Sequence, residues 1–109
     1  MRKSTLFPAI LLSGLLLSTA AQAKDYVLTL KDNKFSPQTI TVPAKQKVRI
    51  TVKNEDATPA EFESSDLNRE KVVAAHGEIV VVVGPLDAGT YTFFDEFHKD
   101  TATGTLIVK

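Results

Sequence analysis

The sequence predicts an all-β protein, a Greek-key β-sandwich of about seven strands. Short segments of alternating or β-branched apolar residues recur along the chain, separated by residues that form turns. No long segment has the period of 3.6 residues that an amphipathic helix requires. Short strands of this kind bury their apolar faces by packing two sheets together, which favours the sandwich.

The first 23 residues have the layout of an export signal and are set apart from the fold. Arg2 and Lys3 provide a charged start, residues 6–17 are mostly apolar, and Ala21-Gln22-Ala23 is a small-x-small cleavage pattern. The apolar stretch is shorter than the roughly 20 residues of a membrane-spanning helix. We predict a signal peptide over 1–23 and one exported, not membrane-embedded domain over 24–109.

Composition narrows the possible partners of the mature chain. All 13 acidic residues but only 11 of the 13 basic residues follow the signal segment, so the mature net charge is about −2. This balance argues against nucleic acid or an anionic membrane as a partner. The chain has no cysteine, so sheet packing, with or without a ligand, must stabilise this small domain without disulfides.

The individual strands are identified by residue pattern. Residues 47–53 alternate strictly between polar and apolar side chains, as a half-buried antiparallel strand requires. Pro37 has no N–H to donate to a strand ladder, so the residues before 40–42 are predicted to lie at a sheet edge or in a bulge. The continuous β-branched run 79–83 predicts a strand with little solvent on either side. The predicted strands are 25–31, 40–42, 47–53, 61–63, 79–83, 90–94 and 105–108.

Two connecting features are also predicted. Residues 66–70 could form one helical turn, with Ser65 or Asp66 as its cap. Tyr91 follows the turn residues 86–90, which predicts a tyrosine corner, in which the phenol bonds back to the backbone at a Greek-key crossover.

The first candidate site is the pair Glu61 and Glu63. Residues i and i+2 of a strand point to the same face, so these carboxylates lie side by side. Two like charges this close repel each other unless a cation or a base lies between them. The alternative is an outer strand face whose glutamates are simply solvated.

The second candidate site follows the aromatic strand 90–94. Extended geometry would place Glu96 and His98 on one face and Asp95 on the other, although a loop could re-aim any of them. Carboxylates with one imidazole suit Zn²⁺, Mn²⁺, iron or Cu²⁺. A solvated loop with a surface histidine is the alternative. No nucleophile elbow or phosphate-binding glycine loop occurs, so we do not predict ordinary hydrolase or transferase activity.

Residues 89–98, followed by 104–108, resemble the last strands and the copper loop of the cupredoxin family. The resemblance covers essentially the whole mature chain and implies a cupredoxin-like sandwich. It places Asp95 at the position of the family's cysteine, His98 at that of its histidine and Ala102 near that of its methionine, while Glu61 falls where the first histidine is usual. A blue-copper centre is rejected because its character depends on a copper–thiolate bond.

A narrower resemblance involves residues 35–44, 58–64 and 93–98. These segments are similar to cupredoxin-like periplasmic proteins and domains that accompany bacterial iron permeases of the Ftr and Efe type. In the Efe branch the proposed metal site combines cysteines with Glu-x-Glu. Here Phe35 and Asp95 occupy the cysteine positions, and Glu61 and Glu63 match the glutamates. The stand-alone Ftr-type partner is the closer analogue.

We therefore predict a periplasmic protein that binds iron or copper and supports iron uptake through an inner-membrane permease, together with a periplasmic iron-binding protein. A metal-free module that docks a permease or another periplasmic protein remains the alternative. A ferroxidase ranks below simple binding, because turnover needs an electron acceptor or a redox-cycling metal. The predicted metal ligands are Glu61, Glu63, Asp95, Glu96 and His98.

Overall fold

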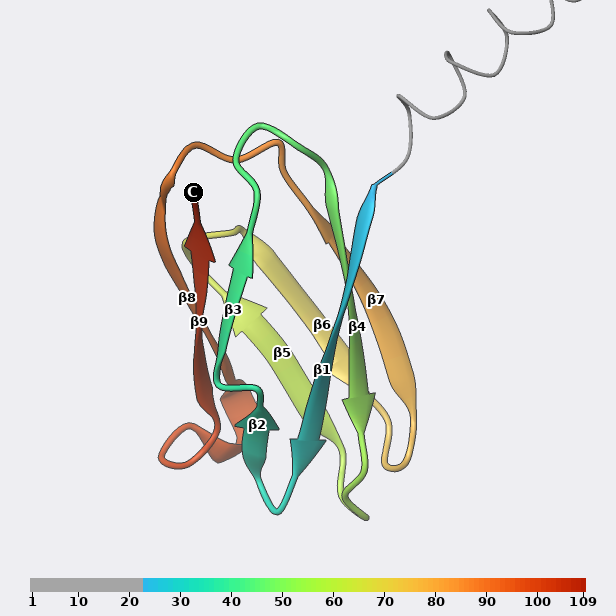
Figure 1. The fold of residues 1–109 in the computed structure, drawn as a ribbon. Helices are drawn as coiled ribbons and strands as arrows, with labels where there is room; N and C mark the ends of the chain where they lie inside the picture. Colours follow the sequence, from blue (N-terminus) through green and yellow to red (C-terminus); the bar gives the residue numbers. More distant parts are fainter. Residues whose placement is uncertain (1–22) are drawn as a thin grey trace, which may run out of the picture.

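The computed structural model describes residues 23–109, and all but Ala23 of the predicted signal peptide lies outside this range. The fold is a sandwich of two sheets (Figure 1). Its elements are β1 (Lys24–Lys31), β2 (Lys34–Ser36), β3 (Thr39–Val42), β4 (Val48–Asn54), β5 (Ala60–Ser64), β6 (Arg69–Val73), β7 (Glu78–Val83), β8 (Gly89–Asp95), the 3₁₀ turn η2 (Glu96–His98) and β9 (Thr103–Val108).

The topology confirms the all-β sandwich and adds two strands to the expected number. One sheet has the order β2-β1-β4-β7 and the other β3-β9-β8-β5-β6. β1 pairs with β4 and β3 with β9 in parallel, whereas the remaining pairs are antiparallel. The segment around Pro37 passes from the first sheet to the second, so residues 34–42 form two short edge strands.

The core lies between the sheets and follows the predicted alternation. Along β4, Val48, Ile50 and Val52 are buried, while Arg49 and Lys53 are exposed. The prediction for residues 79–83 was only partly right. β7 is an edge strand that pairs antiparallel with β4, its outer face meets solvent, and Val82 is 37% exposed.

Three aromatic rings fill the core beneath the end of the sandwich where η2 lies. Phe62 and Phe93 stack with ring centroids 5.3 Å apart. The ring of Phe35 meets both edge-on, 5.1 Å from Phe93 and 6.5 Å from Phe62. Phe35, which the sequence resemblance matched to a cysteine position of Efe-type domains, is a core side chain in the structure.

The tyrosine corner is confirmed at the opposite end of β8. The Tyr91 hydroxyl donates a hydrogen bond to the Asp87 carbonyl oxygen at 2.8 Å. The side chain of Asp87 forms an ion pair with Lys45, whose backbone nitrogen donates to the Leu86 carbonyl. These contacts tie the turn after β3 to the turn before β8.

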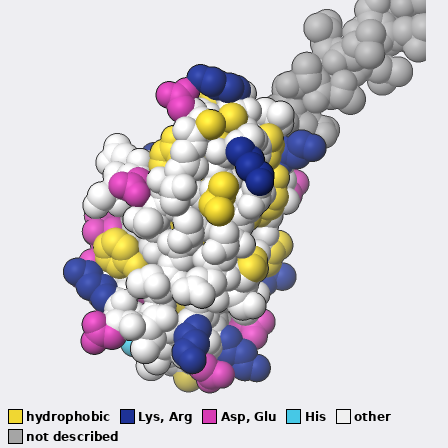
Figure 2. Space-filling model, turned by 60° about the vertical axis from the view of Figure 1, so that its left-hand side comes forward, with side chains coloured by type: hydrophobic (Ala, Val, Ile, Leu, Met, Phe, Trp, Pro, Cys, Tyr) yellow, Lys and Arg dark blue, Asp and Glu magenta, His cyan; other side chains and the backbone are white. Residues whose placement is uncertain are grey.

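The surface carries charges of both signs. On the face in Figure 2, acidic and basic side chains are interspersed, and hydrophobic side chains show between them. Within residues 23–109, no helix is long and apolar enough to cross a membrane.

Candidate metal site

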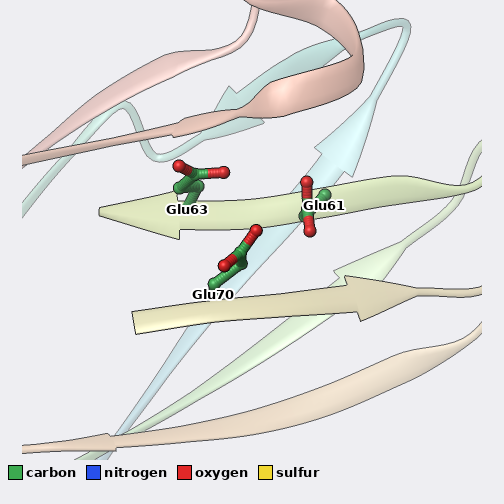
Figure 3. A group of neighbouring side chains, drawn as sticks. All are labelled: Glu61, Glu63 and Glu70. Atoms are coloured by element: carbon green, nitrogen blue, oxygen red, sulfur yellow. The ribbon is translucent and has the colours of Figure 1, made fainter. Parts of the chain in front are cut away.

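Three glutamates meet on the outer face of the five-stranded sheet. Glu61 and Glu63 alternate along β5 with the buried Ala60, Phe62 and Ser64, so both point away from the core, as the sequence predicts. β6 pairs antiparallel with β5 and sets Glu70 directly opposite Glu63. One ligand atom from each of the three glutamates lies within 4.8 Å of the other two. Figure 3 shows Glu70 rising from β6 toward the two carboxylates of β5.

The electrostatics of this group disfavour its full ionisation. Partial burial raises the pKa of the Glu61 carboxyl, and hydrogen bonding and repulsion from Glu70 raise it further. Partial burial also raises the pKa of Glu63, with repulsion from Glu96 and Glu70 added. These shifts mean that a bound cation would relieve an unfavourable interaction present in the folded protein.

Glu96 and Lys99 border the same group. Glu96 acts on both β5 glutamates through its charge. The Lys99 ammonium lies 3.4 Å from a carboxylate oxygen of Glu96 and 5.5 Å from the centroid of the Phe94 ring. Lys99 also lowers the pKa of Glu63, opposing the larger causes that raise it. Lys99 therefore offsets part of the negative charge of Glu63 and Glu96.

Asp95 faces the other way, into the protein. It pairs with Phe62 in the ladder between β5 and β8, and its side chain is only 1% exposed. One carboxylate oxygen, Oδ1, accepts hydrogen bonds from the backbone nitrogens of Glu61 at 2.9 Å and Phe97 at 3.0 Å. The other, Oδ2, lies 2.6 Å from His98 Nδ1.

The chain turns sharply after Asp95, and this changes which side chains meet. Asp95 caps the 3₁₀ turn η2 by accepting from Phe97 N. Because residues i and i+3 align along such a turn, His98 comes back onto Asp95. The extended geometry that grouped Glu96 with His98 and put Asp95 on the other face is therefore not what residues 96–98 adopt.

The predicted ligands thus fall into two groups. The three glutamates Glu61, Glu63 and Glu96 gather on the outer face with Glu70, while Asp95 and His98 pair with each other. Within residues 23–109, the one group of three or more potential ligand side chains close enough to share an ion consists of Glu61, Glu63 and Glu70.

Sequence reasoning missed Glu70 because it read residues 66–70 as a helical turn. In the structure, residues 65–68 form a turn and β6 begins at Arg69. The β-branched pair Val72-Val73, which follows Glu70 after Lys71, is the signal that could have indicated a hairpin with β5.

The sequence matches the family described as "Cupredoxin-like domain" over residues 5–108. The chain belongs to this family. The cupredoxin-like chain is also 47% identical over 81 residues to "Uncharacterized protein RP394" of Rickettsia prowazekii (strain Madrid E). That match covers 74% of this chain but only 65% of the Rickettsia protein.

Solved structures show the same fold at low sequence identity. Auracyanin A, a blue copper protein of Chloroflexus aurantiacus, matches with a TM-score of 0.70 and 17% identity, over 81% of this chain and 100% of its own. The metal-binding domain of the Streptococcus pneumoniae D39 Cu(I)-exporting ATPase CopA matches with a TM-score of 0.68 and 15% identity, over 78% and 84%. Amicyanin of Paracoccus versutus gives 0.61 and 18%, over 82% and 83%.

The cupredoxin-like fold is therefore shared with copper-binding proteins, but the donor set of this chain does not fit a blue-copper centre. The sequence has no cysteine to provide a thiolate. Both oxygens of Asp95 and the Nδ1 atom of His98 are already engaged in internal hydrogen bonds.

Proposed function

We propose that this cupredoxin-like protein binds a metal ion in the periplasm and serves iron uptake through an inner-membrane iron permease. The observation that carries the metal-binding part is the convergence of Glu61, Glu63 and Glu70, with ligand atoms within 4.8 Å of one another. Glu96, beside them, could add a fourth carboxylate. Under this proposal the structure's outer sheet face, rather than the copper loop, holds the ion.

The donor chemistry favours iron over Cu⁺. Carboxylate oxygens are hard ligands, whereas Cu⁺ prefers thiolate and thioether sulfur. The raised pKa values of Glu61 and Glu63 reflect like-charge repulsion as well as partial burial, and a divalent or trivalent cation offsets that repulsion. Cu²⁺ and Mn²⁺ are the competitors that a carboxylate group of this kind would also accept.

The place in iron uptake is supported by the export signal predicted over 1–23 and by the resemblance of residues 58–64 and 93–98 to proteins that accompany iron permeases. Two partners follow from it: the permease and a periplasmic iron-binding protein. A small exported domain with an open carboxylate site suits transient loading and release of iron between them, because partly exposed ligands exchange an ion readily.

Metal binding is tested by calorimetric titration of the protein, expressed with its own leader and stripped with chelator. Fe²⁺ without oxygen, Mn²⁺, Zn²⁺ and Cu²⁺ are each added to wild type, Glu63→Gln and Glu70→Gln. We expect stoichiometric binding of iron to wild type and at least tenfold weaker binding to both variants. Glu55→Gln, which alters an exposed glutamate in the loop after β4, is the matched control and should bind as wild type does.

The role in uptake needs a separate measurement in cells. Cells that lack the protein are complemented with wild type, Glu63→Gln or Glu55→Gln, and the rate of radioactive iron uptake is compared. Restoration by wild type and Glu55→Gln but not by Glu63→Gln supports the proposal. Equal restoration by all three would show that the glutamates do not serve uptake.

A metal-free docking module is the second candidate, and one observation favours it. Phe97 on η2 is 51% exposed and directly follows Glu96, so an aromatic side chain stands beside the acidic group. An exposed aromatic side chain bordered by charges is typical of a protein-binding surface. If none of the four cations binds, and Phe97→Ser abolishes iron uptake in cells, the docking module becomes the better explanation.

A further inference from the structure

We propose that Asp95 and His98 form an internal clamp that takes the place of a copper centre in this cupredoxin-like fold. The clamp is a hydrogen-bonded carboxylate–imidazole pair that fastens the loop 95–102 to β5. It is a structural device that works without metal, and it is separate from the binding of an ion by Glu61, Glu63 and Glu70.

The first argument is the hydrogen bonding of Asp95. An ionised carboxylate can only accept hydrogen bonds, and a buried one needs donors to offset its desolvation. Asp95 has three: two backbone nitrogens on Oδ1, from Glu61 and Phe97, and the His98 imidazole on Oδ2. Within residues 23–109, no buried side-chain nitrogen or oxygen is left without a partner, so the carboxylate is satisfied as it stands.

The second argument is the weakness of the backbone ladder at this point. β5 and β8 are paired at only two positions, Phe62 with Asp95 and Glu63 with Phe94. β8 and β9, by contrast, are paired at six positions. The bond from Glu61 N to the Asp95 side chain continues the contact between β5 and β8 where their ladder stops. Asp95 therefore holds in place the strand that carries Glu61.

The loop itself is closed around the pair. Asp95 N donates to the Ala102 carbonyl at 2.9 Å, and Ala102 N donates to the His98 carbonyl at 2.9 Å. Ala102 is fully buried. One main-chain bond therefore joins the two ends of the loop, a second joins its end to His98, and the Asp95–His98 pair joins its start to His98. These contacts give the loop a defined shape without an ion.

A metal ligand role for His98 is the competing explanation. Histidines that bind metals commonly donate their second nitrogen to a carboxylate, so Nε2 of His98 could in principle hold an ion. A stable site needs further ligands close by. His98 belongs to no group of three potential ligands within residues 23–109, and its own side chain is only 27% exposed. The clamp is the reading that these contacts favour.

A double-mutant cycle tests the clamp. The unfolding equilibrium constant is measured in urea for wild type, Asp95→Asn, His98→Ala and the double variant. Asp95→Asn keeps an oxygen acceptor and nearly the same volume, so the variants remain foldable. Because the two side chains contact each other, we expect their substitutions not to act independently. The unfolding equilibrium constant of the double variant should be about tenfold smaller than the product of the two single effects predicts.

The matched control is Asp100→Asn, which alters an exposed carboxylate of the same loop. The unfolding equilibrium constant of the Asp100→Asn, His98→Ala double variant should equal the product of the two single effects. Independent effects for Asp95→Asn and His98→Ala would overturn the proposal, because a pair that does not couple is not a clamp.

A metal titration separates the clamp from a metal site at His98. Cu²⁺ is titrated into wild type, His98→Ala and Glu63→Gln, and nitrogen NMR locates the imidazole proton. We expect the proton on Nδ1 and a Cu²⁺ affinity of His98→Ala within about twofold of wild type, whether or not the glutamates bind copper. A tenfold or greater loss of Cu²⁺ affinity in His98→Ala, with or without a loss in Glu63→Gln, would overturn the clamp and make His98 a ligand. Loss in Glu63→Gln alone bears on the carboxylate site and leaves the clamp standing.

Discussion

The ring of Phe93 lies against Gly104 so closely that no side chain fits between them. A Cβ atom at position 104 would lie 2.3 Å from both Cε1 and Cζ of Phe93, and 3.1 Å from the Gln38 carbonyl oxygen. Phe93 cannot move aside, because Phe62 stacks on it and Phe35 meets it edge-on. Packing therefore requires a glycine at position 104 of β9, the strand that pairs with β8.

Gly104→Ala is therefore expected to lower the free energy of unfolding by roughly 2–3 kcal/mol, as overpacked cores do. Urea denaturation monitored by circular dichroism measures the change. Gly89→Ala is the matched control, because a Cβ at position 89 meets its nearest atom, Tyr91 Cε1, at an ordinary 3.7 Å. Similar losses for the two substitutions would contradict the packing argument.

Replacing Glu63 by glutamine should stabilise the metal-free protein near neutral pH. A carboxyl whose pKa is raised on folding binds its proton more tightly in the folded state, so its contribution to stability falls as pH rises above the unfolded value, 4.5. Glu63→Gln removes this penalty, and the melting temperature should therefore be higher than that of wild type at pH 7.

The same comparison at acid pH provides the check. Below about pH 4 the carboxyl is protonated in both states, so the difference between Glu63→Gln and wild type should vanish. Thermal melts of both proteins from pH 3 to 8, in chelator, measure it. A variant that is less stable than wild type at pH 7 would show that Glu63 makes a favourable contact that outweighs its repulsion from Glu70 and Glu96.

Lys45 adopts a positive φ of 63° in the turn after β3, a conformation that glycine tolerates better than any residue with a Cβ. Its ammonium pairs with Asp87, and that contact raises the pKa of Lys45 and lowers that of Asp87. Lys45→Gly and Lys45→Ala both remove this exposed pair, but only glycine relieves the backbone. Thermal melting should rank Lys45→Gly several degrees above Lys45→Ala; the reverse order would mean that the turn is unstrained.

Asn54 joins two loops at the end of the sandwich and is 2% exposed. Its amide donates to the carbonyls of Thr58 at 2.9 Å and Ala74 at 3.2 Å, while its oxygen accepts from Asp56 N at 3.0 Å. Asn54→Ala removes these three part-buried hydrogen bonds and is expected to lower the free energy of unfolding by about 2–3 kcal/mol.

Asn54→Asp distinguishes the lost donors from the lost volume. Aspartate keeps the size and the acceptor but has no amide protons. Urea denaturation at pH 7 should find it at least as unstable as Asn54→Ala. Wild-type stability in Asn54→Asp would show that the two donated bonds do not matter.

The strands that could be predicted are those that bury one face. Residues 47–53 alternate because β4 packs one side on the core. The tyrosine corner could be predicted from Tyr91 and the turn residues before it. β6 escaped prediction because only Val73 of its five residues is buried. An edge strand of this kind is held by its backbone pairing with β5, and backbone pairing leaves little periodicity in the sequence.

Two facts about the candidate site follow from the sequence alone. The absence of cysteine rules out a thiolate, because no arrangement of the chain can supply one. The spacing of Glu61 and Glu63 places both on one face, because side chains alternate along any strand. Both depend only on composition or on neighbouring residues.

The tertiary structure decided the rest. It brought Glu70 opposite Glu63 through the pairing of β5 with β6, and it turned Asp95 inward to meet the backbone of Glu61, 34 residues away. Asp95 also caps η2, so residues 96–98 form a 3₁₀ turn instead of an extended segment, and His98 contacts Asp95. These relationships depend on which strands lie side by side and which side chains are buried between them, and a buried carboxylate takes the donors that the fold brings to it.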